Sequence, residues 1–177
     1  ARRVVGVDDQ GPVSKQAHGL LREAALLRVQ PGDRRAAQVA TLMAAAANGI
    51  VAVHEMSGPA IGGAEDLRDL LATAAEIAGP RVFGYWGQLA AEGGIDAARD
   101  LGAVGVGGDL FVDGSLGSHT AALFEPYIDH ASSRGTQYLS VEEITEHLRA
   151  TTIAGIPGGF HAIGDAACAD VASAVAA

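Results

Sequence analysis

From Pro31 onward the chain alternates between segments with helical spacing of apolar residues and short, continuous apolar runs. The helical segments carry apolar side chains every three to four positions, which is typical of amphipathic helices. The apolar runs are rich in β-branched side chains, as expected of buried strands. They begin near residues 50, 81, 104 and 159. Strands that alternate with helices in this way predict a parallel α/β architecture.

Residues that start or stop helices mark the boundaries of the predicted elements. A helix is predicted from Arg34 to Asn48, with Asp33 as its cap and Gly49 as its stop. Ser140 and Glu143 form a capping box that opens a helix to residue 154. Further helices are predicted over residues 19–28, 65–78, 95–101 and from 165 onward.

The predicted strands differ in how clearly the sequence marks them. The first is an unbroken apolar run that ends at His54. The third contains Gly105, Gly107 and Gly108, which weaken the prediction because glycine is unfavourable inside strands. A long polar loop separates this strand from the helix that Ser140 opens. The four strands cover residues 50–53, 81–86, 104–112 and 159–163, and the loop covers residues 113–139.

Two layouts fit these strand–helix units: an open doubly wound sheet, or part of a (β/α)8 TIM barrel. A complete barrel takes about 250 residues, and the units present here are too few to close one. The chain of 177 residues is therefore either a small α/β domain or a segment of a larger protein. Residues 1–30 precede the repeat, and residues 31–177 form the predicted partial barrel domain.

Composition and charge disfavour several classes of function. The chain has 12 basic and 21 acidic side chains and a net charge of −9, which argues against nucleic acid and membrane surfaces as partners. No apolar stretch reaches the roughly 20 residues of a membrane helix, and no signal-peptide pattern opens the chain. The single cysteine, Cys168, excludes a disulfide framework and favours a cytoplasmic setting. We expect Cys168 to pack in the core.

Imidazole and carboxylate groups follow the predicted strands, at the edge where parallel α/β proteins hold their ligands. Such groups bind divalent metals and move protons near neutral pH. A hydrolytic metal site is therefore the sharpest hypothesis. The residues at the strand ends are His54 and Glu55, Tyr85 and Trp86, Asp109 and Asp113, and His161 and Asp165.

Several of these residues also have a purely structural interpretation. His54 could be a hydrogen-bonded residue at a strand end, and Asp165 could simply cap the last helix. Asp109 lies in apolar sequence, where an unpaired carboxylate is costly, so we expect it to be ion-paired or bound to a metal. His161 interrupts an apolar strand, which makes it the stronger of the two histidine candidates.

Two further motifs point to other chemistry but match poorly. The glycines at 105, 107 and 108 lack the Lys-Ser/Thr ending of a phosphate-binding loop and do not open a helix. The run from Gly114 to Ser118 does not match the register of a nucleophile elbow. Both a phosphate-binding loop and a serine hydrolase are therefore disfavoured.

Two longer motifs resemble a known family. The segments DLFVDGSLGSHTAALFEPY, at 109–127, and FHAIGD, at 160–165, resemble the amidohydrolase superfamily, and more narrowly amidohydrolase family 3, the YtcJ-like metal-dependent hydrolases. Three shorter stretches agree with the family in the same order, so the resemblance covers nearly the whole chain. They are GLLREAA at 19–25, GIVAVHEM at 49–56, and Arg134-Gly135 before the capping box.

The resemblance implies a metal-dependent hydrolase on a (β/α)8 barrel with a small flanking β-sandwich. The predicted strands would then be barrel strands two to five. His161 would be the metal-binding histidine of strand five, and zinc is the expected divalent metal. Asp109 falls where the family commonly has a lysine, carboxylated to bridge two metals. Because an aspartate cannot be carboxylated in this way, Asp109 could bind the metal directly, support a one-metal site, or do neither.

We predict His161 and Asp109 as metal ligands, and Asp113 and His119 as catalytic residues. The resemblance implies that, in the full enzyme, the long loop that carries His119 and Tyr127 would cover the mouth of the barrel and contact a small-molecule substrate. A solvated loop residue is the alternative interpretation of His119.

The family's His-x-His pair of the first strand, its sixth-strand histidine and its eighth-strand aspartate have no counterpart here. Two candidate ligands cannot fill a catalytic zinc site, which takes three protein ligands. We therefore expect the chain alone to be inactive, as part of a larger amidohydrolase that hydrolyses an amide, imide or ester bond. The alternatives are a truncated or degenerate relative that acts only as a folding or oligomerising module, and an unrelated α/β binding domain. Open strand edges predict that the isolated chain dimerises or aggregates.

Overall fold

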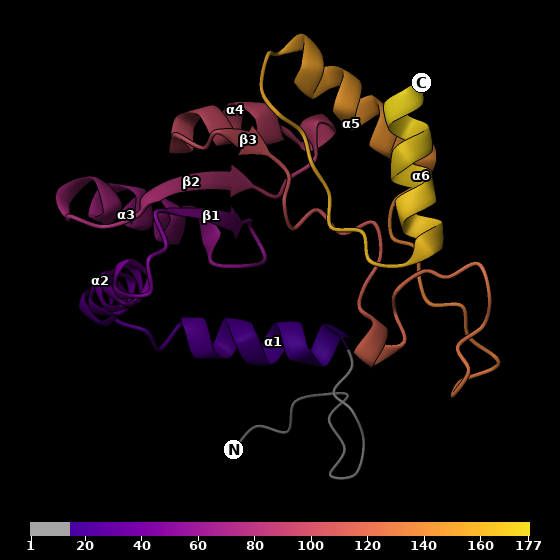
Figure 1. Ribbon diagram of the computed structural model, residues 1–177, viewed down its shortest axis with the longest axis horizontal. Helices are drawn as coiled ribbons and strands as arrows, with labels where there is room; N and C mark the ends of the chain where they lie inside the picture. The colour runs from indigo at the N-terminus through magenta and orange to yellow at the C-terminus, as the bar shows by residue number, and fades with distance from the viewer. Residues whose placement is uncertain (1–14) are drawn as a thin grey trace.

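The computed structural model describes residues 15–177, apart from the side chains of residues 15–18, 23 and 26. The expectation that no signal peptide opens the chain concerns residues outside this range. The first element is helix α1 (Lys15–Leu26), which runs along one side of the molecule in Figure 1. It begins earlier than the predicted helix 19–28 and overlaps most of it. Within the described part of the chain, no helix is long and apolar enough to cross a membrane.

Three parallel strands form the sheet, in the order β1 (Ala52–Ser57), β2 (Arg81–Trp86) and β3 (Gly105–Val106). Their registers place the last residues of the three strands side by side. The carboxyl ends therefore form one edge, as the alternation of strands and helices predicts. This arrangement confirms the α/β class, and the span of β2 agrees with the predicted strand 81–86.

Helices pack on the sheet through one hydrophobic core. Helix α2 (Pro31–Ala47) packs on α3 (Gly63–Glu76), and both α3 and α4 (Gly94–Leu101) pack on β2. Full burial of a large apolar side chain contributes about 1.5–3 kcal/mol, so this cluster is a main source of stability. Its buried members are Leu67, Trp86, Ala98, Leu101 and Val106.

The end of α2 explains why β1 begins later than predicted. Gly49 has a φ of 79°, and the N–H of Ile50 donates to the carbonyl of Ala45 at 3.0 Å, which closes the helix as a Schellman motif. Ile50 is therefore used to end a helix and not to start a strand. The strand continues past His54 as far as Ser57, so the predicted span 50–53 is wrong at both ends.

The two predicted helix caps have different outcomes. Ser140 Oγ accepts the N–H of Glu143 at 3.2 Å, and the Glu143 carboxylate accepts the N–H of Ser140 at 2.8 Å. This pair confirms the capping box of α5 (Val141–Ile153). Asp33 does not cap α2, because Gln30 takes that position and Pro31 is the first helical residue. Proline is favoured there, since its fixed φ suits the helix and it has no N–H to satisfy.

The fourth predicted strand is reduced to two isolated parallel bridges. They join Val106 to Gly158 and Phe111 to His161. The N–H of His161 donates to the carbonyl of Leu110 at 2.8 Å, and its own carbonyl accepts the N–H of Val112 at 2.9 Å. The segment that carries His161 therefore lies beside the chain that continues from β3, as predicted, but without a continuous ladder.

Glycine conformation explains the interruption. Gly107 has a φ of 146° and Gly108 a φ of 84°, values that a regular strand of L-residues does not adopt. A Cβ atom on Gly107 would lie 2.2 Å from the carbonyl oxygen of Gly159, so the two backbones approach too closely for any side chain. The predicted strands 104–112 and 159–163 are therefore both too long.

A second hydrophobic cluster joins α5, α6 (Asp165–Ala176) and the chain after β3, and Figure 1 shows the two helices packed together at one end of the molecule. Cys168 is exposed on α6, so the expectation that it packs in the core is wrong. The helix turns its Ala167 and Ala174 toward the cluster instead. The buried members of this cluster are Val112, Ala122, Ile144, Ala167 and Ala174.

Two short 3-10 helices lie in the connections. They are η1 (Ala90–Glu92), which follows β2, and η2 (Leu116–Ser118), which lies inside the loop 113–139. This loop contains no strand or longer helix in the described structure, in agreement with its polar, glycine-containing sequence.

Candidate functional site

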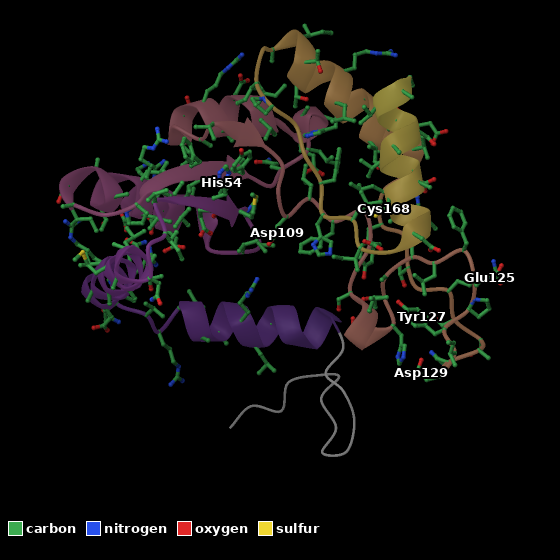
Figure 2. All side chains as sticks on the ribbon, in the orientation of Figure 1. His54, Asp109, Glu125, Tyr127, Asp129 and Cys168 are labelled. Atoms are coloured by element: carbon green, nitrogen blue, oxygen red, sulfur yellow. The ribbon has the colours of Figure 1, made fainter. Side chains whose placement is uncertain are left out.

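The candidate site lies at the carboxyl edge of the sheet. Asp109 follows the end of β3 by three residues, and Figure 2 shows it near the middle of the molecule. His161 lies on the neighbouring segment, paired with Phe111 across the second bridge. The structure therefore brings the two predicted metal ligands to adjacent segments of the same edge.

The ring of His161 is held in one orientation. Its Nε2 lies 3.0 Å from the carbonyl oxygen of Gly114, and its ring packs on Phe111 with a centroid distance of 4.7 Å. A carbonyl can only accept a hydrogen bond, so the neutral ring carries its hydrogen on Nε2. The lone pair of Nδ1 has no hydrogen-bond partner among the described residues. This is the arrangement of a histidine that binds a metal through one nitrogen while the other donates to the protein.

Asp109 is half-buried, and its carboxylate has no hydrogen-bond or ion-pair partner in the described part of the chain. The expected ion pair is therefore not formed there. Its negative charge, together with that of Asp66, reaches Glu55 on β1. Burial is the main reason that the pKa of the Glu55 carboxyl is raised, and the repulsion from Asp66 and Asp109 adds to it. Negative charge thus gathers at this edge.

Asp113 is fully buried and anchors three backbone groups. One oxygen accepts the N–H of Ala122 at 2.8 Å and that of Gly164 at 2.7 Å, and the other accepts the N–H of Ile163 at 2.9 Å. The carboxylate therefore joins the start of the long loop to the turn that follows His161. Its geometry is that of a residue that fixes positions, and its predicted catalytic role stays a prediction.

Asp165 performs a similar function at the start of α6. Gly164 is the capping residue of this helix, so Asp165 is not the cap that the sequence suggests. Its Oδ1 accepts the N–H of Ala166 at 2.9 Å and the N–H of Phe124 at 3.0 Å. The side chain therefore ties the long loop to the helix.

His119 lies in the long loop, away from the pair formed by Asp109 and His161. It is the only non-glycine residue with a positive φ in the described structure, at 53°. Its Nε2 lies 3.0 Å from the carboxylate of Asp129, and this hydrogen bond is the main cause of the lowered pKa of Asp129. Figure 2 shows Asp129 and Tyr127 in the loop, well apart from Asp109. The structure does not bring His119 to the carboxyl edge.

His54 lies in the middle of β1 and not at its end. Its exposed ring packs on Phe83 and Tyr85 of β2, with centroid distances of 5.1 and 5.7 Å. Arg81 lies over the Phe83 ring at 5.4 Å. These contacts form a row of rings on the face of the sheet opposite to α3, in place of the strand-end hydrogen bond that the structural interpretation of His54 expected.

The sequence analysis missed His147, a buried histidine of α5 that is 2% exposed. It is hydrogen-bonded to the backbone of Ala90 and of Val106, and burial lowers its pKa. A signal was available: His147 is three residues after Ile144 and four before Thr151, and both of these are also buried. Helical spacing therefore places the ring on the buried face of α5.

A complete metal centre is not formed by the part of the chain that the structure describes. Among the side chains that the structure describes, no group of three or more His, Cys, Asp or Glu is arranged to hold a metal ion. His161 and Asp109 are thus two candidate donors without a third.

Parallel strands covered by helices, with an imidazole and a carboxylate at their carboxyl ends, define a class: parallel α/β proteins that hold ligands at this edge. The sequence profile of the amidohydrolase family matches residues 10–177. The chain therefore belongs to the amidohydrolase family, and within it to amidohydrolase family 3. This membership confirms the resemblance carried by the segments 109–127 and 160–165.

Two curated proteins are similar over shorter stretches. Protein LONG AFTER FAR-RED 3 of Arabidopsis thaliana is 39% identical over 57 residues, which cover 32% of this chain and 10% of that protein. YtcJ of Bacillus subtilis (strain 168), which is named as an amidohydrolase, is 39% identical over 66 residues, covering 37% of this chain and 12% of YtcJ. The matched stretches are thus a small part of either relative.

Two solved structures share the fold. They are uncharacterized metal-dependent hydrolases from Pyrococcus furiosus and Pyrococcus horikoshii OT3, each with a TM-score of 0.75 and with identities of 23% and 24%. The superposition covers 99% and 97% of this chain but only 38% and 36% of those chains. The chain therefore spans well under half the length of these structural relatives.

Proposed function

We propose that this chain supplies strands two to five of the (β/α)8 barrel of a metal-dependent amidohydrolase. The enzyme would hydrolyse a C–N bond, amide or imide, or an ester bond of a small molecule. Residues 31–177 would form this part of the barrel, and residues 1–30 would precede it. The single cysteine supports a cytoplasmic setting as part of the proposal.

The orientation of His161 carries the proposal. Its Nε2 is held by the carbonyl of Gly114 at 3.0 Å, which leaves Nδ1 as the nitrogen for a metal. Asp109, on the adjacent segment, has a carboxylate without a protein partner among the described residues. The relatives also support a metal-dependent amidohydrolase, since the Pyrococcus proteins are described as metal-dependent hydrolases and YtcJ is named as an amidohydrolase.

The two donors fit a divalent metal, with zinc as the expected ion, but they form only part of its site. A catalytic zinc ion takes three protein ligands, so a further ligand would come from a longer polypeptide or from a second copy of this chain. When bound, the metal ion supplies a nucleophilic hydroxide near neutral pH and polarises the scissile carbonyl group.

The other site residues would act on position and on substrate. Asp113 fixes the backbone of Ile163 and Gly164, directly after His161, and so sets where the imidazole stands. The loop 113–139 would contact substrate, with His119 oriented by its hydrogen bond to Asp129. In that orientation Nε2 donates to the carboxylate, and Nδ1 is the nitrogen that can accept a proton.

A second candidate function is a non-catalytic amidohydrolase module that serves only in folding or association. The observation that favours it is the lack of a three-ligand group in the described residues. Aspartate at position 109, where the family commonly has lysine, also favours the non-catalytic module.

Metal content tests whether His161 and Asp109 form part of a metal site on this chain. We expect the purified chain, dialysed without chelator, to retain about one zinc ion per chain, or about half if a site forms between two copies. His161→Ala and Asp109→Ala should each lower this content, as measured by elemental analysis. His54→Ala is the matched control, because it removes an imidazole from β1, on the other side of the sheet, without removing a proposed ligand.

A chain that holds no metal would contradict a site assembled on this chain alone or between two copies of it, and the further ligand would then have to come from a longer polypeptide. Equal loss of metal in all three variants would contradict the assignment of His161 and Asp109. A metal-loaded chain should next be tested for hydrolysis of simple amide, imide and ester substrates.

A further inference from the structure

His147 connects α5 to the carboxyl ends of two strands. Its Nδ1 accepts the N–H of Ala90 at 3.0 Å, in η1 after β2. Its Nε2 lies 3.2 Å from the carbonyl oxygen of Val106, the last residue of β3. The ring is 2% exposed, so neither hydrogen bond competes with solvent.

The two partners fix the protonation state of the ring. A backbone N–H can only donate and a carbonyl can only accept, so Nδ1 is unprotonated and Nε2 carries the hydrogen. An imidazolium would set an N–H against the N–H of Ala90. Burial lowers the pKa of His147, which agrees with a neutral ring. The side chain is therefore a rigid spacer with a donor at one end and an acceptor at the other.

The Val106 carbonyl lies at the junction of the two segments that carry the candidate ligands. It also accepts the N–H of Gly159 at 3.1 Å. Asp109 follows Val106 by three residues, and His161 follows Gly159 by two. A shift of this carbonyl would therefore move both candidate ligands.

Backbone hydrogen bonds also join the two segments, from the N–H of Val106 to the carbonyl of Pro157 and from the N–H of His161 to the carbonyl of Leu110, but the pairing is not regular. Two isolated bridges replace a continuous ladder, and the glycines that follow Val106 can adopt many backbone conformations. The His147 ring also packs edge-on against Phe160, the residue before His161, with a centroid distance of 5.0 Å. One side chain thus contacts both segments at the point where they separate.

We propose that His147 is a positioning residue that sets the spacing of Asp109 and His161 through its hydrogen bond to the Val106 carbonyl. This inference rests on the proposed function, because it assigns those two residues to one metal site. It deepens that proposal by naming a buried group that, in addition to Asp113, fixes the site's geometry.

Three substitutions separate the two hydrogen bonds. His147→Gln keeps a donor near the position of Nε2, and His147→Asn keeps an acceptor near the position of Nδ1. His147→Leu keeps apolar volume and neither hydrogen bond. We expect zinc affinity, measured by competition with a chelator, to fall about tenfold in the Leu and Asn variants and to stay near the unaltered value in the Gln variant.

Amide hydrogen exchange gives a readout that needs no metal. The N–H groups of Gly159 and His161 should lose protection in the Leu and Asn variants but not in the Gln variant. Thr73→Val is the matched control, because Thr73 is also a buried, hydrogen-bonded side chain but lies on α3, where its partners are Arg35 and Gln38 of α2. It should lower protection evenly across the chain.

Two outcomes would overturn the inference. One is a Leu variant that folds and keeps both the zinc affinity and the protection of Gly159 and His161. The other is an even loss of protection in all three His147 variants, because this would show a general contribution to stability. If the unaltered chain binds no zinc, no site is assembled on this chain alone, and the exchange pattern still decides whether His147 holds the junction.

Discussion

At the scale of single residues, buried polar side chains fix where the backbone of the candidate site lies. Asp113 and His147 are both buried, and each is hydrogen-bonded to backbone groups of segments distant in sequence. A buried group of this kind is costly unless all of its partners are present. Such residues are therefore the positions where a small chemical change has a large structural effect.

Asp113→Asn tests this at the carboxylate. An amide has one acceptor oxygen, and its NH2 group would face N–H groups that now donate to the second oxygen. We expect the free energy of unfolding to fall by about 3 kcal/mol, as measured by urea denaturation followed by fluorescence of the single tryptophan, Trp86. Asp96→Asn is the control, since that carboxylate is 88% exposed and its change should cost about 0–1 kcal/mol. Equal effects at both positions would contradict the anchoring role.

His147 makes stability depend on pH. Its pKa in the folded chain is below the ordinary value of 6.5, because burial disfavours the charged ring. Below about pH 6.5 the unfolded chain takes up a proton on this ring that the folded chain does not. This group should therefore lower the free energy of unfolding as the pH decreases below about 6.5, and it should have no such effect at higher pH. Urea denaturation at about pH 7.5 and 5.5 should show a smaller loss for His147→Gln than for the unaltered chain. Equal losses would contradict this explanation.

The sequence marks His161 as a candidate residue, but it marks neither His147 nor the anchoring role of Asp113. His161 is visible because its ring interrupts an apolar run. His147 is more deeply buried than His161, but it lies among charged residues of α5, and only the helical spacing of Ile144 and Thr151 marks its face. The role of Asp113 depends on N–H groups up to 51 residues away, which no local pattern contains.

At the scale of elements, local signals determined most boundaries, and glycines explain the main exceptions. β2 and the capping box of α5 agree with the sequence because their signals are local. The junction of β3 with the segment of His161 does not, because Gly107 and Gly159 are in close contact, which depends on tertiary structure. Strand length at that junction is thus set by contact between backbones and not by propensity.

Gly107→Ala tests the junction. A Cβ atom there would lie 2.2 Å from the Gly159 carbonyl oxygen, and the φ of 146° is itself unfavourable for alanine. We expect the free energy of unfolding to fall by about 2–4 kcal/mol, measured by urea denaturation. Gly32→Ala in α2 is the control, because no atom lies within 4 Å of its added Cβ and the helix should gain about 1 kcal/mol. A neutral Gly107→Ala would show that the two segments can separate freely.

At the scale of the whole molecule, the alternation of strands and helices was enough to predict which edge holds the candidate ligands. Parallel strands bring their carboxyl ends together, so the amino-acid sequence alone places Asp109 and His161 on one edge. It does not place His119, since the loop 113–139 has no periodicity that fixes where it runs. The superposition covers only 38% and 36% of the lengths of the two structural relatives, so this chain matches one part of a longer fold.

The sheet also predicts association. Among the strands that the structure describes, β1 is the last on its side of the sheet, and Val51, directly before it, is 80% exposed. An open strand edge with exposed apolar residues favours pairing with another chain. Sedimentation velocity should show dimers or larger species that become fewer in Val51→Lys. Val175→Lys is the control, because Val175 is 69% exposed but lies on α6. Equal association in both variants would exclude the β1 edge as the contact.

The hydrogen bonds of Asp113 also define which parts of this fold can be exchanged between homologues. The carboxylate joins residues 9, 50 and 51 positions away along the chain. A recombination crossover between residues 122 and 163 would pair this carboxylate with backbone from a different parent. Chimeras of amidohydrolases should therefore inherit the loop and the turn after His161 as one block, and libraries built with crossovers inside that block should contain few folded members.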